Sequence, residues 1–441
     1  MKKTINLIIL FTFLNNCSFD NKTGIWTGSD QIAKNRNESQ NLELVFKEKN
    51  NIIETKELSS EQNLTLDNPT LFLAWDQRYQ NRFNNVGNVS FLNEGNYKKY
   101  SKISKSEINE NILVYKNNLF YSDYKGNIRV FSLSQNQLIF EFNFYKKKMK
   151  RAKKIIKLII KDDFIIAADN FGYIYSINYK KNKLNWAKNH LVPFRSNLKI
   201  INKTLFLSDE KNKIILIDIV SGKKIDELYT QPSKTVSKFE SNLAIDNNEN
   251  LLFLSTSGSL YSLKLINQKK INWIQNFKSE NELIFNGNPI IISKDEIMIS
   301  TNNSISLLNT NGRRLWNLDI TSSTSPIISG NIIFTINKDN YLILIDKNKG
   351  QIIYSKNIYL MLEKEFSKNF KRKIKKIKHI YLVNKKLLLI SSNSHFIELD
   401  IGNYISINSL KKNPFDISSD IIFLNNEMIF ISNSKRMFKV N

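Results

Sequence analysis

The chain has 441 residues, a formal net charge of +25 and a sequence pI of about 9.7. Its single cysteine excludes an intramolecular disulfide, and its three histidines, none paired at ligand spacing, leave little basis for a zinc site or a Ser-His-Asp arrangement. The charge alone would suggest nucleic acid, but the chain is rich in Lys, Asn and Ile together, which AT-rich coding produces without a functional demand. We therefore expect no nucleic acid partner.

The N-terminus has the pattern of an export signal. Met1-Lys2-Lys3 gives a positively charged start, and Ile5 to Leu14 form an apolar stretch too short to span a bilayer. Cys17 follows within three residues, and the pattern resembles a bacterial lipoprotein signal in which residues 1–16 are removed and Cys17 is lipidated. That resemblance, with Ser18 after the cysteine, implies a lipid anchor at the periplasmic face of the outer membrane. A plain secretory signal with an incidental cysteine is the alternative.

Residues 17–66 are rich in Asn, Lys, Glu and Ser and show little periodicity. Such a composition predicts a tether rather than a packed unit. We place the folded body at residues 67–441.

From about residue 111 onward one pattern recurs, with copies about 37 to 54 residues apart. Each copy has a short apolar strand, a small or glycine-containing turn, an alternating strand, a polar turn and then a large apolar residue. The clearest copies are GYIYSINYKKNKLNW from Gly172, GSLYSLKLINQKKINW from Gly258 and NSISLLNTNGRRLW from Asn303. Repeats of this length made of short strands predict an all-β fold, an eight-bladed β-propeller with one four-stranded blade per repeat.

Seven blades are nearly complete in the sequence, at 111–145, 155–190, 198–230, 242–278, 288–320, 325–358 and 378–410. The stretch from Asp416 to Asn441 begins an eighth repeat that lacks its last strand. Residues 68–76, which end in Trp75-Asp76, look like the missing strand. We therefore predict that this N-terminal strand completes the last blade and closes the ring.

Tryptophans occur at one phase of the repeat: Trp75, Trp186, Trp273 and Trp316. Large aromatic side chains at a fixed phase are most simply explained by docking between neighbouring blades, where each buries a large apolar area. We assign these four residues a structural role.

The widest spacing between repeats holds a basic insertion near residues 360–378. Leu362, Phe366, Phe370, Ile374 and Ile377 have the spacing of one helical face, which predicts an amphipathic helix. Its basic residues Lys371, Arg372, Lys375 and Lys376 are candidates for contact with a partner or an anionic lipid surface. The alternative is that the apolar stripe packs on the propeller and the lysines are solvated.

The motifs Ile217-Asp218-Ile219-Val220-Ser221-Gly222-Lys223 and Asn309-Thr310-Asn311-Gly312-Arg313-Arg314-Leu315-Trp316 resemble the pyrroloquinoline quinone (PQQ) type repeat. With the lipoprotein signal and the chain length, the sequence is similar to the propeller lipoproteins of the outer-membrane β-barrel assembly machinery. This resemblance implies a non-enzymatic scaffold without a cofactor, whose loops contact the barrel-forming subunit and help to insert β-barrel proteins.

Two other classes stay open. A PQQ-dependent dehydrogenase would need a cofactor sandwich that, in that family, includes a disulfide of adjacent cysteines, and a calcium ion. Cys17 alone rules out the disulfide, and no carboxylate constellation stands out beyond residues at turns. A periplasmic propeller that binds an anionic polymer or glycan is compatible with the charge, and such binding would weaken steeply with salt.

Overall fold

The computed structural model describes residues 53–59, 62–145, 149, 151–232, 239–265, 270–279, 282–366 and 374–441. It also describes the backbone of two short antiparallel strands, β1 (Ser18–Phe19) and β2 (Trp26–Thr27). Contacts divide the chain into the units Met1–Ile52 and Ile53–Asn441. Cys17, the predicted lipid attachment residue, lies outside the described residues. Within those ranges no helix has the length and apolar character needed to cross a membrane.

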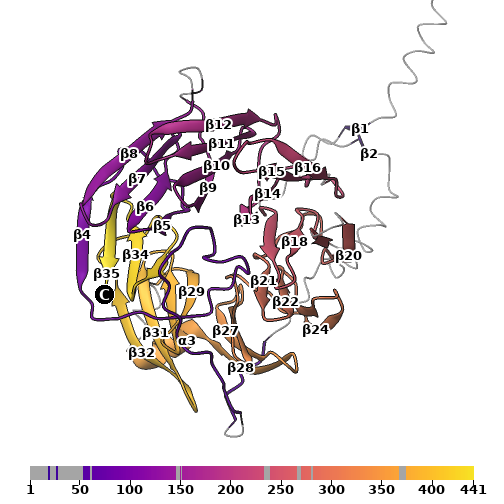
Figure 1. Cartoon of the computed structure of the whole chain (residues 1–441). Coiled ribbons are helices and arrows are strands. Elements are labelled where there is room, and N and C mark those ends of the chain that lie inside the picture. The colour runs from indigo at the N-terminus through magenta and orange to yellow at the C-terminus, as the bar shows by residue number, and fades with distance from the viewer. Residues whose placement is uncertain are drawn as a thin grey trace, which may run out of the picture. The chain divides into compact units, whose positions relative to one another are not determined.

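The second unit is a ring of eight antiparallel sheets, seven with four strands and one with a fifth strand added (Figure 1). The predicted eight-bladed β-propeller is therefore confirmed. We number the sheets as blades 1 to 8 in chain order, beginning with the sheet that contains β5.

Four strands form each of the first four blades in the order of the sequence. Blade 1 contains β5 (Leu113–Tyr115), β6 (Asn118–Ser122), β7 (Asn127–Ser132) and β8 (Gln137–Asn143). Blade 2 contains β9 (Ile156–Lys161), β10 (Phe164–Asp169), β11 (Tyr173–Asn178) and β12 (Lys183–Asn189). Blade 3 contains β13 (Lys199–Ile201), β14 (Thr204–Ser208), β15 (Ile214–Asp218) and β16 (Lys224–Leu228). Blade 4 contains β17 (Asn242–Ile245), β18 (Asn250–Leu254), β19 (Ser259–Lys264) and β20 (Lys270–Asn276).

The other blades repeat this arrangement, with additions in the last two. Blade 5 contains β21 (Ile291–Ser293), β22 (Glu296–Ser300), β23 (Ile305–Asn309) and β24 (Arg314–Leu318). Blade 6 contains β25 (Ile327–Ser329), β26 (Ile332–Ile336), β27 (Tyr341–Asp346) and β28 (Gln351–Asn357). Blade 7 contains β29 (Ile377–Val383), β30 (Lys386–Ser391), β31 (His395–Ile401) and β32 (Ile405–Lys412), with β3 (Asn88–Val89) parallel to β29. Blade 8 contains β33 (Ile422–Leu424), β34 (Glu427–Ile431), β35 (Arg436–Val440) and β4 (Tyr97–Lys102).

The burial of the strands explains the repeat. In blade 4 the first three strands are almost wholly buried, because neighbouring blades cover both faces, and they read as apolar runs. The outermost strand β20 is mostly exposed and alternates. Because the four strands of a blade are antiparallel, every connection from an outermost strand to the next innermost strand lies on one face of the ring, which we call the connection face. The opposite face is the hairpin face.

An N-terminal strand completes blade 8 and closes the ring, as predicted, but it is formed by other residues than those predicted. β4 pairs antiparallel with β35, with Lys99 opposite Phe438 and Tyr97 opposite Val440, so residues 97–102 complete blade 8. Residues 68–76 were wrongly assigned to this place. Trp75 instead forms an isolated bridge with Val114 of β5, at the centre of the ring. The sequence of β4 does not look like a strand because only Tyr100 is buried. The other five side chains, three of them lysines, are exposed and give no apolar alternation.

Part of the predicted tether also belongs to the propeller. Lys56 pairs with Ser355 on the outer edge of β28, with N to O distances of 2.9 Å in both directions. Leu58, Leu64 and Leu66 pack against the core shared by blades 6 and 7. The folded body therefore begins near residue 53 rather than at residue 67.

The predicted basic helix begins and ends earlier than its apolar spacing indicated. α3 spans Ile358–Phe366, and the Asn357 side chain caps it by accepting hydrogen bonds from the N–H groups of Tyr359 and Leu360. Leu362 is buried, as the pattern predicts, but Ile377 is buried in β29 instead of on a helix. The helix contains one of the basic residues of the segment, Lys364, in its last turn. Lys375 and Lys376 of the predicted basic face lie after the helix.

Candidate functional site

The centre of the ring is crossed by residues 67–92, which we call the central strap. In Figure 1 this indigo segment runs through the middle of the propeller. It meets the innermost strands close to the ends that lead into the first hairpin of each blade. The strap starts at blade 6, passes around the ring and returns to blades 7 and 8 before β4.

Hydrogen bonds tie the strap to all eight blades. The contacts are Asp67 N–H to Ser329 Oγ in blade 6, Asn425 N–H to Phe72 O in blade 8, Trp75 N–H to Val114 O in blade 1, Ile160 N–H to Asp76 O in blade 2, Lys199 Nζ to Asn81 O in blade 3, Ile245 N–H to Arg82 O in blade 4 and Ile292 N–H to Phe83 O in blade 5, all between 2.7 and 3.0 Å. Blade 7 is joined by the pairing of β3 with β29. The strap thus connects all the blades at the centre of the ring, and we call the strap with the innermost strands around it the hub.

One carboxylate of the hub bridges two basic side chains. Glu240 accepts a hydrogen bond from Arg78 Nη1 at 3.0 Å and another from Lys157 Nζ at 2.8 Å. Burial opposes the ionisation of Glu240, but the charges of Lys157 and Arg78 outweigh it and lower its pKa to about 2. Burial lowers the pKa of Lys157 to about 8, against the opposing effect of Glu240. This cluster joins the strap to blade 2 and to the connection before blade 4.

Lys199 is a further buried basic residue of the hub. Its ammonium group donates to Gln77 Oε1 at 3.1 Å and to Asn81 O at 2.7 Å, both in the strap. Burial lowers its pKa to about 7, and the nearby carboxylate of Asp76 only partly opposes this effect. The side chain is therefore held by hydrogen bonds to neutral groups rather than by an ion pair.

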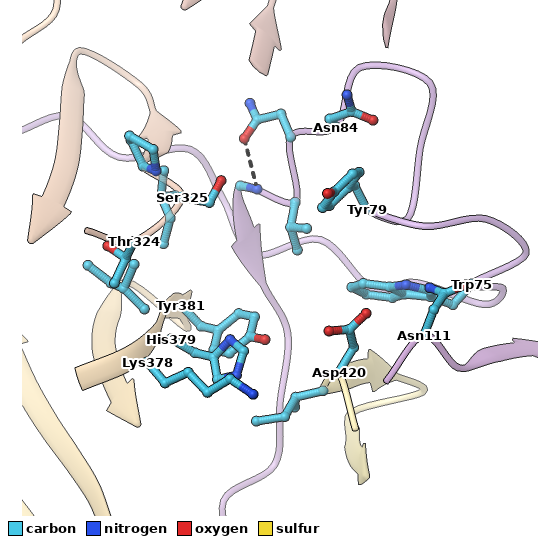
Figure 2. Close-up of a pocket in the computed structure, with 17 residues that line it drawn as sticks. Trp75, Tyr79, Asn84, Asn111, Thr324, Ser325, Lys378, His379, Tyr381 and Asp420 are labelled. Atoms are coloured by element: carbon cyan, nitrogen blue, oxygen red, sulfur yellow. Dashed lines mark hydrogen bonds between the residues drawn. The ribbon is translucent and has the colours of Figure 1, made fainter. Parts of the chain in front are cut away.

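A cavity of about 160 Å³ lies between the strap and the first residues of the innermost strands of blades 1, 6, 7 and 8. Figure 2 shows Trp75 and Tyr79 of the strap on one side and Lys378, His379 and Tyr381 of β29 on another. Burial lowers the pKa of His379 to about 4, so its imidazole is neutral at pH 7. Burial also raises the pKa of Tyr79 and that of Tyr381.

The polar atoms of this cavity suit a few small polar molecules such as water. Two buried oxygens at its edge, Asn84 Oδ1 and Thr324 Oγ1, have no hydrogen-bond partner in the protein. The carboxylate of Asp420 lies across from Tyr79 in Figure 2. A cavity of this size and polarity can hold about five water molecules at about 30 Å³ each.

These residues do not fit a quinone cofactor of the kind for which the repeat is named. Sites for such ligands have volumes of roughly 300–1,000 Å³, well above that of the hub cavity, because the strap fills the centre of the ring. Among the described residues, no group of three or more His, Cys, Asp or Glu side chains is placed to hold a metal ion. We derive no chemistry through such a group.

Three of the predicted docking tryptophans occupy equivalent places at blade junctions. Each indole Nε1–H donates to a backbone carbonyl of the next blade: Trp186 to Ile219 at 3.0 Å, Trp273 to Thr310 at 2.9 Å and Trp316 to Lys347 at 2.7 Å. Trp75 differs, because it lies in the strap, lines the hub cavity and contacts Phe72 edge to face. The structure thus separates Trp75 from the other three.

Two of the four basic residues predicted to contact a partner or a membrane can be located in the structure. Lys375 and Lys376 are exposed and lie between α3 and β29, while Lys371 and Arg372 lie outside the described residues. The backbone of this stretch is fixed by Lys375 N–H to Asn393 Oδ1 at 3.1 Å and by Ser392 N–H to Lys376 O at 2.8 Å. The two lysine side chains are therefore presented at the connection face.

Exposed apolar side chains occur on three successive connections of that face. Leu191 between blades 2 and 3 is 83% exposed, Tyr229 between blades 3 and 4 is 72% exposed, and Leu283 between blades 4 and 5 is 86% exposed. We call these three the connection-face residues. We take these three as candidates for an interaction surface, because they are large apolar side chains exposed on successive connections of one face. Sequence periodicity could not identify them, because Leu191 and Leu283 lie between the predicted repeats and Tyr229 lies at the very end of one.

The ring of eight blades with its recurrent tryptophan contacts defines a propeller of the PQQ-like class. Residues 104–356, more than half of the chain, match the family model described as outer membrane protein assembly factor BamB. The chain belongs to this family.

Solved structures show the same fold. BamB from Moraxella catarrhalis superimposes with a TM-score of 0.60 at 10% identity, covering 79% of this chain and 99% of that chain. A europium-containing methanol dehydrogenase gives a TM-score of 0.60 at 10% identity, with coverages of 82% and 88%. Sqt1 from Saccharomyces cerevisiae gives 0.56 at 11% identity, with coverages of 79% and 98%. At these identities the likeness concerns the fold. No curated protein sequence matches this chain significantly.

Proposed function

We propose that this protein is a non-enzymatic scaffold lipoprotein of the outer-membrane β-barrel assembly machinery. Its membership of the assembly-factor family is the observation that carries this proposal. The strap supports it, because it fills the position at the hub where a dehydrogenase of this fold class would need room for a cofactor.

In this proposal the partner is the barrel-forming subunit of the machinery, and the connection-face residues are the contact. Leu191, Tyr229 and Leu283 lie on connections rather than in strands, so a partner can cover them without disturbing the blades. Burying one such side chain stabilises a complex by roughly 1.5–3 kcal/mol. Cys17 supplies the lipid anchor, so that the propeller works at the periplasmic face of the outer membrane.

Site-specific photo-crosslinking in native membranes tests the proposal. A photoreactive residue at 191 or 283 should form a crosslink to a subunit of the barrel-assembly machinery. Val220 and Tyr404 are matched controls, because they are 67% and 73% exposed but lie in turns of the hairpin face. The proposal fails if neither connection-face position yields such a crosslink, or if the controls yield it equally.

The net charge of +25 favours one competing function, the binding of an anionic polymer or glycan. Binding of this kind depends on screened charges and falls steeply between low and physiological salt. A contact made by apolar connection-face residues should persist. Retention of the partner through washes of increasing salt therefore separates the two functions.

A further inference from the structure

The outermost strands share one position that normally carries an aromatic side chain. In each of blades 1 to 7 the register between the third strand and the outermost strand shifts at a β-bulge. The last residue pair before this shift, counted along the third strand, marks an equivalent position in every blade, and we compare the outermost-strand residue of that pair. These residues are Phe140, Trp186, Asp226, Trp273, Trp316, Tyr354 and Ser409, in blade order. Five of the seven are aromatic. Blade 7 instead has Ser409.

The local sequence shows that Ser409 occupies the tryptophan position. Ile407-Asn408-Ser409 stands in the same register as Leu184-Asn185-Trp186 and Ile271-Asn272-Trp273. Ser409 pairs with Glu398, whereas Trp186 pairs with Ser176. Only the aromatic ring of the pattern is missing.

The opposite half of the contact is retained in blade 8. Gly222 and Gly312 each lie two residues before an outermost strand and have a positive φ. Each packs against an indole of the preceding blade, Trp186 and Trp273 respectively, so closely that a Cβ added to the glycine would clash with the ring. Gly95 lies two residues before the outermost strand β4 and has a φ of +77°, but nothing lies within 4 Å of its Cβ position. The seam between blades 7 and 8 thus has the receiving glycine without the indole.

A cavity of about 570 Å³ lies at this seam. Its apolar lining includes Phe91, Leu388, Phe396, Met428 and Val440. Ser409, Gly95 and Tyr97 also line it, so the cavity coincides with the missing aromatic contact. Its volume is within the range of roughly 300–1,000 Å³ that ligand pockets occupy.

The rim of the seam cavity is basic. Glu398 in the lining is already engaged by Ser409 Oγ at 3.3 Å, Asn93 Nδ2 at 3.4 Å and Lys386 at 3.7 Å. Lys411 in the lining and Lys99, which is on the same face of β4 as Tyr97, are exposed, and neither has an ion-pair partner among the described residues. An acidic group near the bound ring would therefore find free cations.

We propose that the seam cavity is an acceptor site for an aromatic side chain from an extended segment of a partner protein, with acidic residues beside that side chain. The segment lies along β32, which is the last strand of its sheet among the described residues and so has a free outer edge there. The outermost strand of blade 6 shows that such an edge accepts an extended chain, because Lys56 pairs there with Ser355. This site is separate from the connection-face residues and does not depend on the scaffold role.

The probe is the peptide acetyl-Glu-(5-fluoro-Trp)-Glu-amide, titrated with the protein and followed by fluorine NMR. A saturable shift of the fluorine signal is expected. Ser409→Trp should weaken binding at least about tenfold, because its own indole occupies the cavity. Ser409→Ala is the matched control and should bind within about twofold of the unmodified protein. Absence of a saturable shift, or unchanged binding to Ser409→Trp, overturns the proposal.

A second pair of measurements does not depend on the folding of the Ser409→Trp variant. Lys99→Glu with Lys411→Glu changes exposed side chains and should weaken the glutamate peptide at least about fivefold at low salt. The same variant should bind acetyl-Lys-(5-fluoro-Trp)-Lys-amide more tightly than the unmodified protein does. Equal binding of both peptides to both proteins would remove the acidic neighbours from the proposal and so overturn it as stated.

Discussion

Trp273 of blade 4 and Gly312 of blade 5 form one contact that explains two features of the repeat. The indole lies over the glycine so closely that a Cβ at residue 312 would be 2.5 Å from it, and the indole N–H donates to Thr310 O at 2.9 Å. Gly312 also has a φ of +80°, which side chains rarely adopt. The polar turn and the tryptophan of neighbouring repeats are therefore two halves of one junction.

Gly312→Ala should destabilise the propeller by more than about 1 kcal/mol, since the methyl group meets both an unfavourable φ and the indole. Chemical unfolding followed by far-UV circular dichroism measures the change. Gly402→Ala is the matched control, because its Cβ meets nothing within 4 Å and its φ is not in the left-handed region. Equal stability of the two variants would contradict the prediction.

Replacement of Trp186 should separate ring packing from hydrogen bonding. Trp186→Phe keeps an aromatic ring but loses the bond to Ile219 O, and should cost about 1 kcal/mol. Trp186→Ala removes a side chain of a residue that is 8% exposed, and should cost about 3–5 kcal/mol. The free energy of unfolding of each variant tests this order, and a larger loss for phenylalanine than for alanine would refute it.

Lys199 should make stability rise with pH above neutrality. Its pKa is about 7 in the folded protein, whereas an unfolded lysine titrates near about 10.4. Between these values the unfolded chain binds the extra proton, so the stability contribution of this residue increases as pH rises, approaching about 1 kcal/mol per pH unit. Lys199→Met should flatten the difference in unfolding free energy between pH 7 and pH 10. An unchanged slope would show that the amine does not titrate differently on folding.

Truncation should distinguish the N-terminal segment from the strap. Removal of residues 1–52 should leave the melting temperature of the propeller unchanged, because residues 53–441 form a compact unit of their own. Removal of residues 1–102 should prevent a cooperative transition, because both the strap and β4 are lost. Differential scanning calorimetry of the two truncated chains measures this. A cooperative transition in the shorter chain would contradict the role of the strap.

Charge reversal tests the basic stretch after α3. Lys375→Glu with Lys376→Glu should change stability by less than about 0.5 kcal/mol, because both side chains are exposed. If the stretch contacts lipid, binding to vesicles of anionic phospholipid should fall, since each basic residue near such a surface contributes about 1 kcal/mol. Sedimentation with vesicles at two salt concentrations measures it. Unchanged sedimentation would remove the membrane contact from consideration.

The regular part of the propeller could be predicted because the strands and turns of each of these blades are consecutive in the sequence. Alternation, turn residues and a large apolar residue recur within about 35 residues. Blades 1 to 6 fall within the predicted ranges, and the strands β29 to β32 of blade 7 extend one or two residues beyond the predicted 378–410. Closure of the ring could not be read in this way. Residues 68–76 resemble a blade strand, while Tyr97 to Lys102 do not, and the pairing with β35 joins segments far apart in the sequence.

The hub and the helix show two further limits of local patterns. The strap makes its contacts through single residues such as Asp76, Asn81 and Arg82, which share no period. At α3 the apolar residues from Leu362 to Ile377 suggested one helix, but they belong to a short helix and to the start of β29. The spacing misled because both elements bury their apolar residues in the same core. The seam cavity is the opposite case, since the register of β32 reveals it once the pairing is known.

The strap also has a consequence for how the protein is made. Residues 67–102 leave the ribosome before any blade, yet their contacts require strands that end at residue 440. The strap and β4 therefore cannot complete their contacts until β35 has been synthesised, and these contacts join residues more than 300 positions apart. Such high contact order predicts slow folding. If the protein is exported, as proposed above, this slow closure would leave time to translocate the chain before a stable ring forms.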